Sequence, residues 1–230
     1  MDYPSHCRAE AFELFAQQLP QINRTANLLR AAIAVSMHAL DDVVPEDAED
    51  YLRALAARVL SRVRNRSVPA LLAHVHQVMF EEEGFTGNQT NYYQPLNSYI
   101  PAVLGLKRGL PITLTLIYKV VGEHVGLRIE GVNAPGHFLA RVATDDGWLI
   151  VDPFFHGSVL SREEAFRRIE QIMGRPIPHS REYLSTASHV QWLERILVNL
   201  ENVLEAQHRH DDLAAMNELR RLLEERTLSA

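Results

Sequence analysis

His137 and Asp152 are of the residue types best suited to acid–base chemistry, and their spacing suggests that they meet. A carboxylate that orients an imidazole supplies two members of a nucleophile–base–orienter triad. The two residues flank a predicted β-hairpin, because an Asp-Gly step separates two apolar stretches. Pairing Ala143 with Trp148 brings Asp152 opposite Leu139, one diagonal step from His137 on the same sheet face. The spacing therefore predicts contact between imidazole and carboxylate. The alternative is a histidine and a turn aspartate that serve packing alone.

Helices are predicted to precede this hairpin over the first ninety residues. Apolar residues recur every three or four positions from Leu29 to Leu40 and from Leu52 to Val63. Pro45 and Pro69 suit first helical turns, where an amide hydrogen has no partner within the helix. From Gly84 to Pro95 the chain is rich in turn residues and aromatics. This composition predicts a long ordered loop of the kind that often carries function.

A strongly apolar helix is predicted from Pro111 to about Val125, where Gly126 stops it. Its apolar residues go nearly all the way round, so we expect it to be buried on most sides. A strand from Leu127 to Asn133 and the two hairpin strands follow. Ser161–Glu164 forms a capping box that opens another helix. Two amphipathic helices then end the chain and are expected to form an antiparallel hairpin.

These elements predict an α+β fold in three consecutive regions. Residues 1–84 form an N-terminal helical region, residues 85–180 form a core of one buried helix and a small antiparallel sheet, and residues 181–230 form a C-terminal helical hairpin.

Five short segments, in this order along the chain, carry a resemblance to a known family. They are Phe85-Thr86-Gly87-Asn88, Asn97-Ser98-Tyr99, Gly109-Leu110-Pro111-Ile112-Thr113-Leu114, Gly136-His137-Phe138 and Asp152-Pro153-Phe154. Residues 25–160 thereby resemble the SirB-type transglutaminase-like family, bacterial proteins related to a module also found in some F-box proteins. The C-terminal helical pair resembles the tetratricopeptide-like tail common in that family. The resemblance implies a papain-like fold, with the N-terminal helical bundle packed on the transglutaminase-like core.

The same resemblance implies a base at His137, an orienter at Asp152 and a nucleophile at the start of the central helix, near Pro111 to Thr113. No cysteine lies there, since the single cysteine is Cys7. Cys7 is expected in a flexible N-terminal arm, as an incidental thiol. Thr113 or Ser98 would have to replace the thiol, and a hydroxyl attacks at neutral pH only with a closely placed base.

A binding surface is expected near these segments as well. The expected binding residues are Asn88, Tyr93, Asn97, Ser98, Tyr99 and Gly136. The tyrosines offer apolar rings with polar tips, which suits a pocket wall formed by the loop and equally suits plain packing.

Charge and cysteine content limit which kinds of partner and cofactor we expect for this protein. Lys and Arg number 23 against 29 Asp and Glu, so the formal charge is −6 and disfavours nucleic acid or anionic membrane as partners. One cysteine forms no internal disulfide and no multi-thiolate zinc site. His74 and His76 point to different helix faces, and the His208–Asp212 stretch suits a solvated junction, so no metal is expected. No glycine-rich phosphate fingerprint is present, and no other cofactor is expected. The absence of a signal-peptide pattern predicts a cytoplasmic location.

Three functions remain open at this point. The favoured one is a transglutaminase-like pseudoenzyme without the nucleophilic cysteine, which acts as a regulatory or protein-interaction module. The alternative is a hydrolase or amidase that uses Thr113 or Ser98 with the His137–Asp152 pair. A ligand-binding role for the loop from Phe85 to Asn97 is compatible with either.

Overall fold

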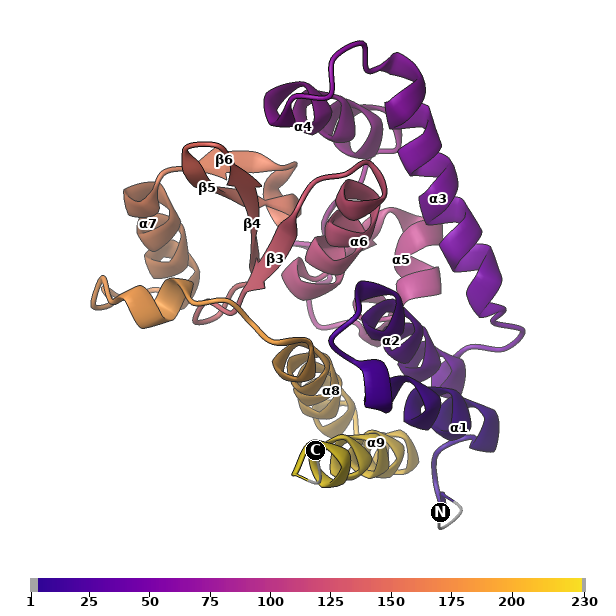
Figure 1. The fold of residues 1–230 in the computed structure, drawn as a ribbon. Coiled ribbons are helices and arrows are strands. Elements are labelled where there is room, and N and C mark those ends of the chain that lie inside the picture. The colour runs from indigo at the N-terminus through magenta and orange to yellow at the C-terminus, as the bar shows by residue number, and fades with distance from the viewer. Residues whose placement is uncertain (1–3, 229–230) are drawn as a thin grey trace. The chain divides into compact units, whose positions relative to one another are not determined.

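The computed structural model describes residues 4–228 and divides the chain into two compact units (Figure 1). The first unit takes the chain up to residue 48, residues 90–106 and the chain from residue 188 on. The second unit takes residues 49–89 and 107–187. The helices predicted for residues 1–84 are thus divided between the units. The division into residues 1–84, 85–180 and 181–230 stays a prediction.

The first unit is helical and is built around one apolar helix. Its elements are α1 (Ala9–Gln18), the 3-10 turn η1 (Leu19–Gln21), α2 (Thr25–Ala39), the 3-10 turn η3 (Pro95–Asn97), α5 (Ile100–Leu106), α8 (His189–Ala206) and α9 (His210–Leu228). Helix α2 is buried nearly all round and contacts α1, α5, α8 and α9. Helices α8 and α9 pack along each other, as the predicted C-terminal hairpin requires.

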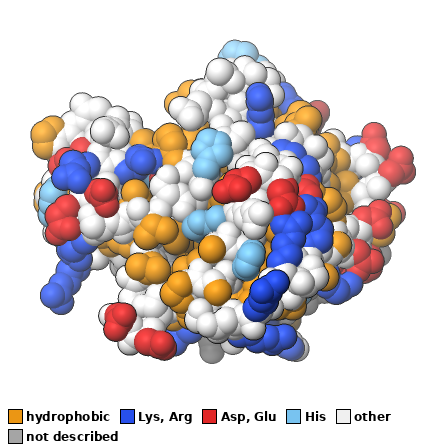
Figure 2. Space-filling view, turned by 90° about the horizontal axis from the view of Figure 1, so that it is seen from above, with side chains coloured by type: hydrophobic (Ala, Val, Ile, Leu, Met, Phe, Trp, Pro, Cys, Tyr) orange, Lys and Arg blue, Asp and Glu red, His pale blue; other side chains and the backbone are white. Residues whose placement is uncertain are grey.

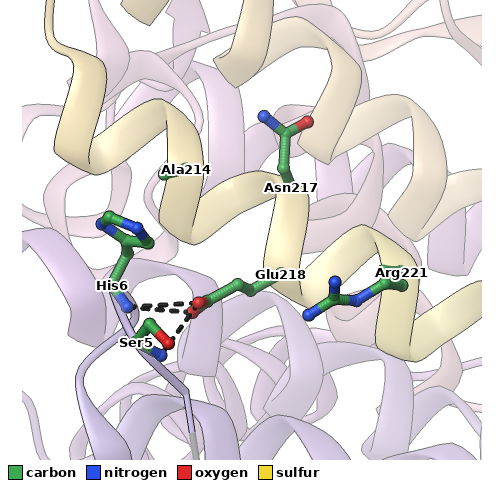
Figure 3. A pocket seen from close by; sticks show the side chains of 6 residues that line it. All are labelled: Ser5, His6, Ala214, Asn217, Glu218 and Arg221. Atoms are coloured by element: carbon green, nitrogen blue, oxygen red, sulfur yellow. Dashed lines mark hydrogen bonds between the residues drawn. The ribbon is translucent and has the colours of Figure 1, made fainter.

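The N-terminal arm is anchored to α9, which corrects the expectation of a flexible arm. The Glu218 carboxylate accepts hydrogen bonds from the backbone N–H groups of Ser5 (2.8 Å), His6 (3.2 Å) and Cys7 (2.9 Å). Figure 3 shows Glu218 reaching from α9 toward Ser5 and His6 beside a pocket. The Cys7 side chain is buried. One carboxylate thus satisfies three successive amides that would otherwise lack partners within the protein.

The second unit combines helices with two small sheets. Its helices are α3 (Pro45–Arg62, most of which lies here), α4 (Val68–His76), the π-helical turn η2 (Gln77–Glu82), α6 (Pro111–His124), η4 (Pro153–Phe155), α7 (Arg162–Met173) and η5 (Arg181–Leu184). Its strands are β1 (Thr86–Gly87), β2 (Arg108–Gly109), β3 (Ile129–Val132), β4 (Leu139–Thr144), β5 (Gly147–Asp152) and β6 (Ser158–Leu160). The sequence therefore predicted the α+β class correctly.

The four-stranded antiparallel sheet, in the order β3-β4-β5-β6, lies between α6 and α7 (Figure 1). Ile129 faces α6, because a Cβ on Gly122 would come within 2.2 Å of its side chain. Val132 faces the other way and packs with Ala165 of α7. Helix α6 is buried along every residue from Pro111 to Gly122, which confirms the buried central helix. Strand β6 was not expected from the sequence.

Candidate functional site

The hairpin brings His137 and Asp152 together, and its register is the predicted one. Ala143 pairs with Trp148 in the β4–β5 ladder. His137 Nε2 lies 2.9 Å from Asp152 Oδ2, within hydrogen-bond distance. The predicted contact between imidazole and carboxylate is therefore confirmed. Its role in catalysis stays a prediction.

Local backbone contacts fix both side chains. The His137 N–H donates to the carbonyl oxygen of Ala134, at 3.2 Å. Gly136, just before it, has φ +67°, and a Cβ there would come within 2.7 Å of Met173 Sδ on α7. Asp152 ends β5 and caps η4, since its Oδ1 accepts a hydrogen bond from the Phe154 N–H at 3.2 Å. Gly136 thus holds the backbone beside α7, a role that glycine alone fills without strain.

Arg168 of α7 also contacts Asp152, which the sequence did not predict. Its Nη1 lies 3.1 Å from Asp152 Oδ2, the oxygen that also bonds His137. Its guanidinium stacks 4.0 Å above the centre of the Phe155 ring. The predicted capping box of Ser161 and Glu164 begins α7 and so sets the position of Arg168 along this helix. We call His137, Asp152 and Arg168 the His137 cluster.

His137 and Asp152 are enclosed by protein, whereas the Arg168 side chain is 21% exposed. His137 is 1% exposed and Asp152 is 0% exposed. The rings of Phe154 and Phe155 lie 5.9 Å and 6.1 Å from the imidazole, centre to centre. Phe154 in turn packs on Gly87 of β1, where a Cβ would approach its ring to 2.5 Å. A buried carboxylate needs a compensating charge and hydrogen bonds, and Arg168, His137 and the Phe154 amide supply them.

The first two turns of α6 lie next to this cluster and carry two buried threonines. Thr115 Oγ1 donates to the carbonyl oxygen of Phe138, the residue after His137, at 3.4 Å. Thr113 is 0% exposed, and its hydroxyl has no hydrogen-bond partner among the described residues. The position at which the resemblance implies a nucleophile therefore holds a buried hydroxyl that no base activates in this structure.

Cys7 is unsuited to replace a missing nucleophile. It belongs to the first unit, whereas the His137 cluster belongs to the second. Burial and then the charge of Glu218 raise the pKa of the Cys7 thiol to about 12. Because the thiolate is the attacking form, this thiol is nearly inert at neutral pH.

The other predicted site residues are divided between the units. Asn88 belongs to the second unit with Gly136, and its N–H donates to the Gly109 carbonyl oxygen at 3.1 Å. Tyr93, Asn97, Ser98 and Tyr99 belong to the first unit. The structure therefore gathers His137, Asp152, Thr113, Asn88 and Gly136 in one unit and the remaining four in the other.

Asn97 and Ser98 organise the loop in the first unit. Asn97 Nδ2 donates to the carbonyl oxygens of Asn91 (2.7 Å) and Tyr92 (2.9 Å). The Ser98 N–H donates to the Pro95 carbonyl oxygen at 2.9 Å. Ser36 of α2 accepts the first N–H of α5, from Ile100, at 3.1 Å. These hydrogen bonds give the Asn97 side chain a structural role in the loop. Ser98 takes part through its backbone N–H.

The histidines considered as metal ligands have separate partners. His74 Nδ1 lies 3.3 Å from Gln77 Oε1, whereas His76 Nε2 lies 2.9 Å from the Tyr118 hydroxyl. Within residues 4–228, no three His, Cys, Asp or Glu side chains converge in a way that could hold a metal ion. In the same part of the chain, no helix combines the length and apolarity needed to cross a bilayer.

A buried central helix, an antiparallel sheet and a histidine–aspartate pair at the end of its hairpin define a transglutaminase-like core. The family model described as the transglutaminase-like superfamily matches residues 46–198, which is well over half of the chain. The chain therefore belongs to the transglutaminase-like superfamily.

Several relatives share much of the chain. A UPF0162 protein of Xylella fastidiosa (strain 9a5c) is 33% identical over 196 residues, 84% of this chain and 70% of the relative. A UPF0162 protein of Pseudomonas aeruginosa is 25% identical over 94% of this chain and 76% of the relative. Mouse F-box only protein 21 is 34% identical over 102 residues, 41% of this chain and 16% of that longer protein. No solved structure matches the chain.

Proposed function

We propose that this protein is a non-catalytic, SirB-type transglutaminase-like module that regulates or binds other proteins. The observation that carries this proposal is that His137 and Asp152 are buried in a unit that contains no cysteine, since Cys7 belongs to the other unit. Acyl transfer needs a nucleophile held about 3–3.5 Å from a substrate carbonyl. His137 and Thr113, 1% and 0% exposed, offer no surface on which a substrate could reach that geometry.

The His137 cluster has a sufficient structural role. His137 comes just before β4, Asp152 ends β5 and caps η4, and Arg168 comes from α7. One buried carboxylate oxygen thus joins the hairpin to the helix that covers it. Removing one partner from such a buried network leaves an unpaired polar group or charge, which costs several kcal/mol in proteins.

The interaction role is supported by the occurrence of this sequence within larger proteins. The stretch shared with F-box only protein 21 makes up 16% of that protein. A stretch that forms a small part of a longer protein suits a module that acts with partners. On the face seen in Figure 2, Lys and Arg side chains lie beside Asp and Glu side chains, which suits a protein partner of mixed charge. The cytoplasmic location and the tetratricopeptide-like character of α8 and α9 belong to this proposal.

The second candidate is a hydrolase or amidase in which Thr113 attacks and His137 accepts its proton. One observation favours it: the Thr113 hydroxyl is buried and has no hydrogen-bond partner in the described chain. Such a group costs stability, and strained or unsatisfied groups cluster at functional sites. Asp152 engages Nε2 of the imidazole, so Nδ1 would have to be the base. This reaction requires an opening of the core that exposes both residues.

An activity test separates the two candidates. The purified protein is incubated with p-nitrophenyl acetate, with a glutamine peptide plus a primary amine, and with a fluorophosphonate probe. We expect hydrolysis, amine incorporation and labelling no faster than in a Thr113→Val and His137→Asn double variant. Melting temperatures are measured in parallel, and the single His137→Asn change should lower the melting temperature.

The result that overturns the proposal is turnover by the unmodified chain that disappears in a folded Thr113→Val variant. Ser98→Ala is the matched hydroxyl control, because Ser98 is buried but belongs to the other unit. Turnover lost with Ser98→Ala, and kept with Thr113→Val, also overturns the non-catalytic function.

A further inference from the structure

A cavity of about 370 Å³ lies within the first unit, where three distant segments meet. The end of α2 contributes Ala39 and Leu40. The loop residues Gln94, Pro95 and Leu96 contribute with Tyr99, and the α8–α9 turn contributes Gln207 and Arg209. Its volume falls in the range of small-molecule pockets, which begins at about 300 Å³. None of these residues belongs to the unit that holds the His137 cluster.

Arg209 gives one end of the cavity a hydrogen-bonding fork. Its Nε donates to Asp212 Oδ2 at 2.7 Å. Its two terminal nitrogens have no hydrogen bond to any described residue, and the side chain is 39% exposed. A guanidinium presents paired N–H donors that match the two oxygens of a carboxylate. Arg209 therefore has donors available at the cavity surface.

The other carboxylate oxygen of Asp212, Oδ1, is hydrogen-bonded to His38. His38 Nε2 lies 3.0 Å from Asp212 Oδ1, and the Arg8 N–H donates to His38 Nδ1 at 3.4 Å. The imidazole is therefore the neutral tautomer that donates to Asp212, and burial lowers its pKa in agreement. Asp212 thus holds Arg209 in place through one bond and is itself held by His38.

Tyr99 supplies an unused hydroxyl to the same region. The side chain is 2% exposed, and its hydroxyl has no hydrogen-bond partner among the described residues. Burial raises the pKa of Tyr99 to about 12; the charge of Arg209 lowers this pKa and the charge of Asp212 raises it, both by less than burial does. The hydroxyl therefore keeps its proton, lies near this ion pair and requires an acceptor.

The rest of the cavity suits an apolar side chain and a peptide bond. Leu40, Pro95 and Leu96 form its apolar wall, and Leu96 is 38% exposed. Gln207 Nε2 donates to the Tyr93 carbonyl oxygen at 3.3 Å, which ties the loop to the α8–α9 turn. Tyr93 is itself 76% exposed. Exposed tyrosines beside a pocket are typical of protein-recognition sites.

We propose that this cavity binds the free C-terminal end of a partner protein. The terminal carboxylate lies against Arg209. It accepts a hydrogen bond from the Tyr99 hydroxyl after a side-chain shift, because that hydroxyl is closed to solvent in the described structure. The last side chain, an apolar one, packs against Leu40 and Leu96. The amide side chain of Gln94 pairs with the peptide backbone, because an amide both donates and accepts.

This inference rests on the protein-binding part of the proposed function and names its partner class. It is independent of the chemistry at His137. If peptide binding fails while the acyl-transfer assays stay negative, the cavity assignment falls and the non-catalytic reading stands. If turnover is found, peptide binding can still be scored by itself.

The test uses fluorescein-labelled hexapeptides that end in leucine, valine, phenylalanine or methionine, each as free acid and as C-terminal amide. Binding is followed by fluorescence anisotropy with the full chain. At least one free acid should bind. Its amide should bind at least about tenfold more weakly, because the amide lacks the charge-assisted pair of hydrogen bonds. Acetyl-leucine should compete only at much higher concentration than the peptide.

Variants connect binding to this cavity. Arg209→Gln should weaken binding of the free acid by about tenfold and leave the weak binding of the amide unchanged. Tyr99→Phe should weaken binding of the free acid without lowering the melting temperature, since its hydroxyl has no partner to lose. Arg220→Gln is the matched control. Arg220 lies on α9, its Nε donates to Glu201 at 2.7 Å, and it does not line the cavity.

Equal binding of acid and amide, or of the wild type and a folded Arg209→Gln variant, overturns the proposal. So does the absence of binding by all four free acids at millimolar concentration. Competition by acetyl-leucine as strong as that of the peptide also overturns it, because the site then takes a free small acid rather than a protein end.

Discussion

Replacing Thr113 by valine should stabilise this protein. The Thr113 side chain is 0% exposed, and its hydroxyl has no partner among the described residues. Valine keeps the branched shape and the preferred helical rotamer, and it removes the unsatisfied group. A buried polar group without a partner costs about 1–3 kcal/mol. The free energy of unfolding should therefore rise by about 1 kcal/mol or more, and the melting temperature by ~2–4 °C for each kcal/mol.

Thr115→Val is the matched control on the same helix. Thr115 is also fully buried, but its hydroxyl donates to the Phe138 carbonyl oxygen at 3.4 Å. Its loss should lower the free energy of unfolding by about 0.5–1.5 kcal/mol. Urea unfolding followed by far-ultraviolet circular dichroism measures both variants under identical conditions. The two changes, two residues apart, should have opposite signs.

A destabilisation of about 1 kcal/mol or more by Thr113→Val would refute this reasoning, because it is the cost expected for losing a made hydrogen bond. It would mean that the hydroxyl has a partner in solution. Thr113 would then no longer count as a buried hydroxyl without a partner. Its role as a nucleophile that is hydrogen-bonded to a base would gain support.

Three further predictions follow from burial. Ile117→Ala, at a fully buried position of α6, should lower the free energy of unfolding by about 2–5 kcal/mol through the cavity that it leaves, and a loss near zero in urea unfolding would place the residue at the surface. Cys7 should react with iodoacetamide at pH 8 about a thousandfold more slowly than a free cysteine, because burial raises its pKa to about 12. Unfolding in urea should restore the rate, and a fast reaction of the native protein would contradict a buried thiol. Burial lowers the pKa of His76 from 6.5 to about 4, so the unfolded chain binds this proton first and stability should fall by up to about 3 kcal/mol as the pH drops from 6.5 to 4. His76→Gln should flatten that fall in a pH series of melting curves, His74→Gln should not, and an equal effect of both would remove His76 as the cause.

Local pattern alone determined much of the second unit. The apolar run bounded by Pro111 and Gly126 predicted a buried helix, and α6 runs from Pro111 to His124. The Asp-Gly step predicted the β4–β5 register, and that register predicted the contact of His137 with Asp152. These features follow from periodicity, capping and turn chemistry, which act over a few residues and are visible in the sequence.

Only the tertiary structure decided which side chains complete each site. Arg168 follows Arg167, and nothing in the pattern tells which of the two reaches Asp152, because that depends on how α7 lies on the sheet. The loop expected as one wall is divided, with residue 89 in one unit and residue 90 in the other. Tyr99 and Arg209 line one cavity although they are far apart in sequence. Such contacts arise from packing between distant segments, so single-sequence periodicity carries no record of them.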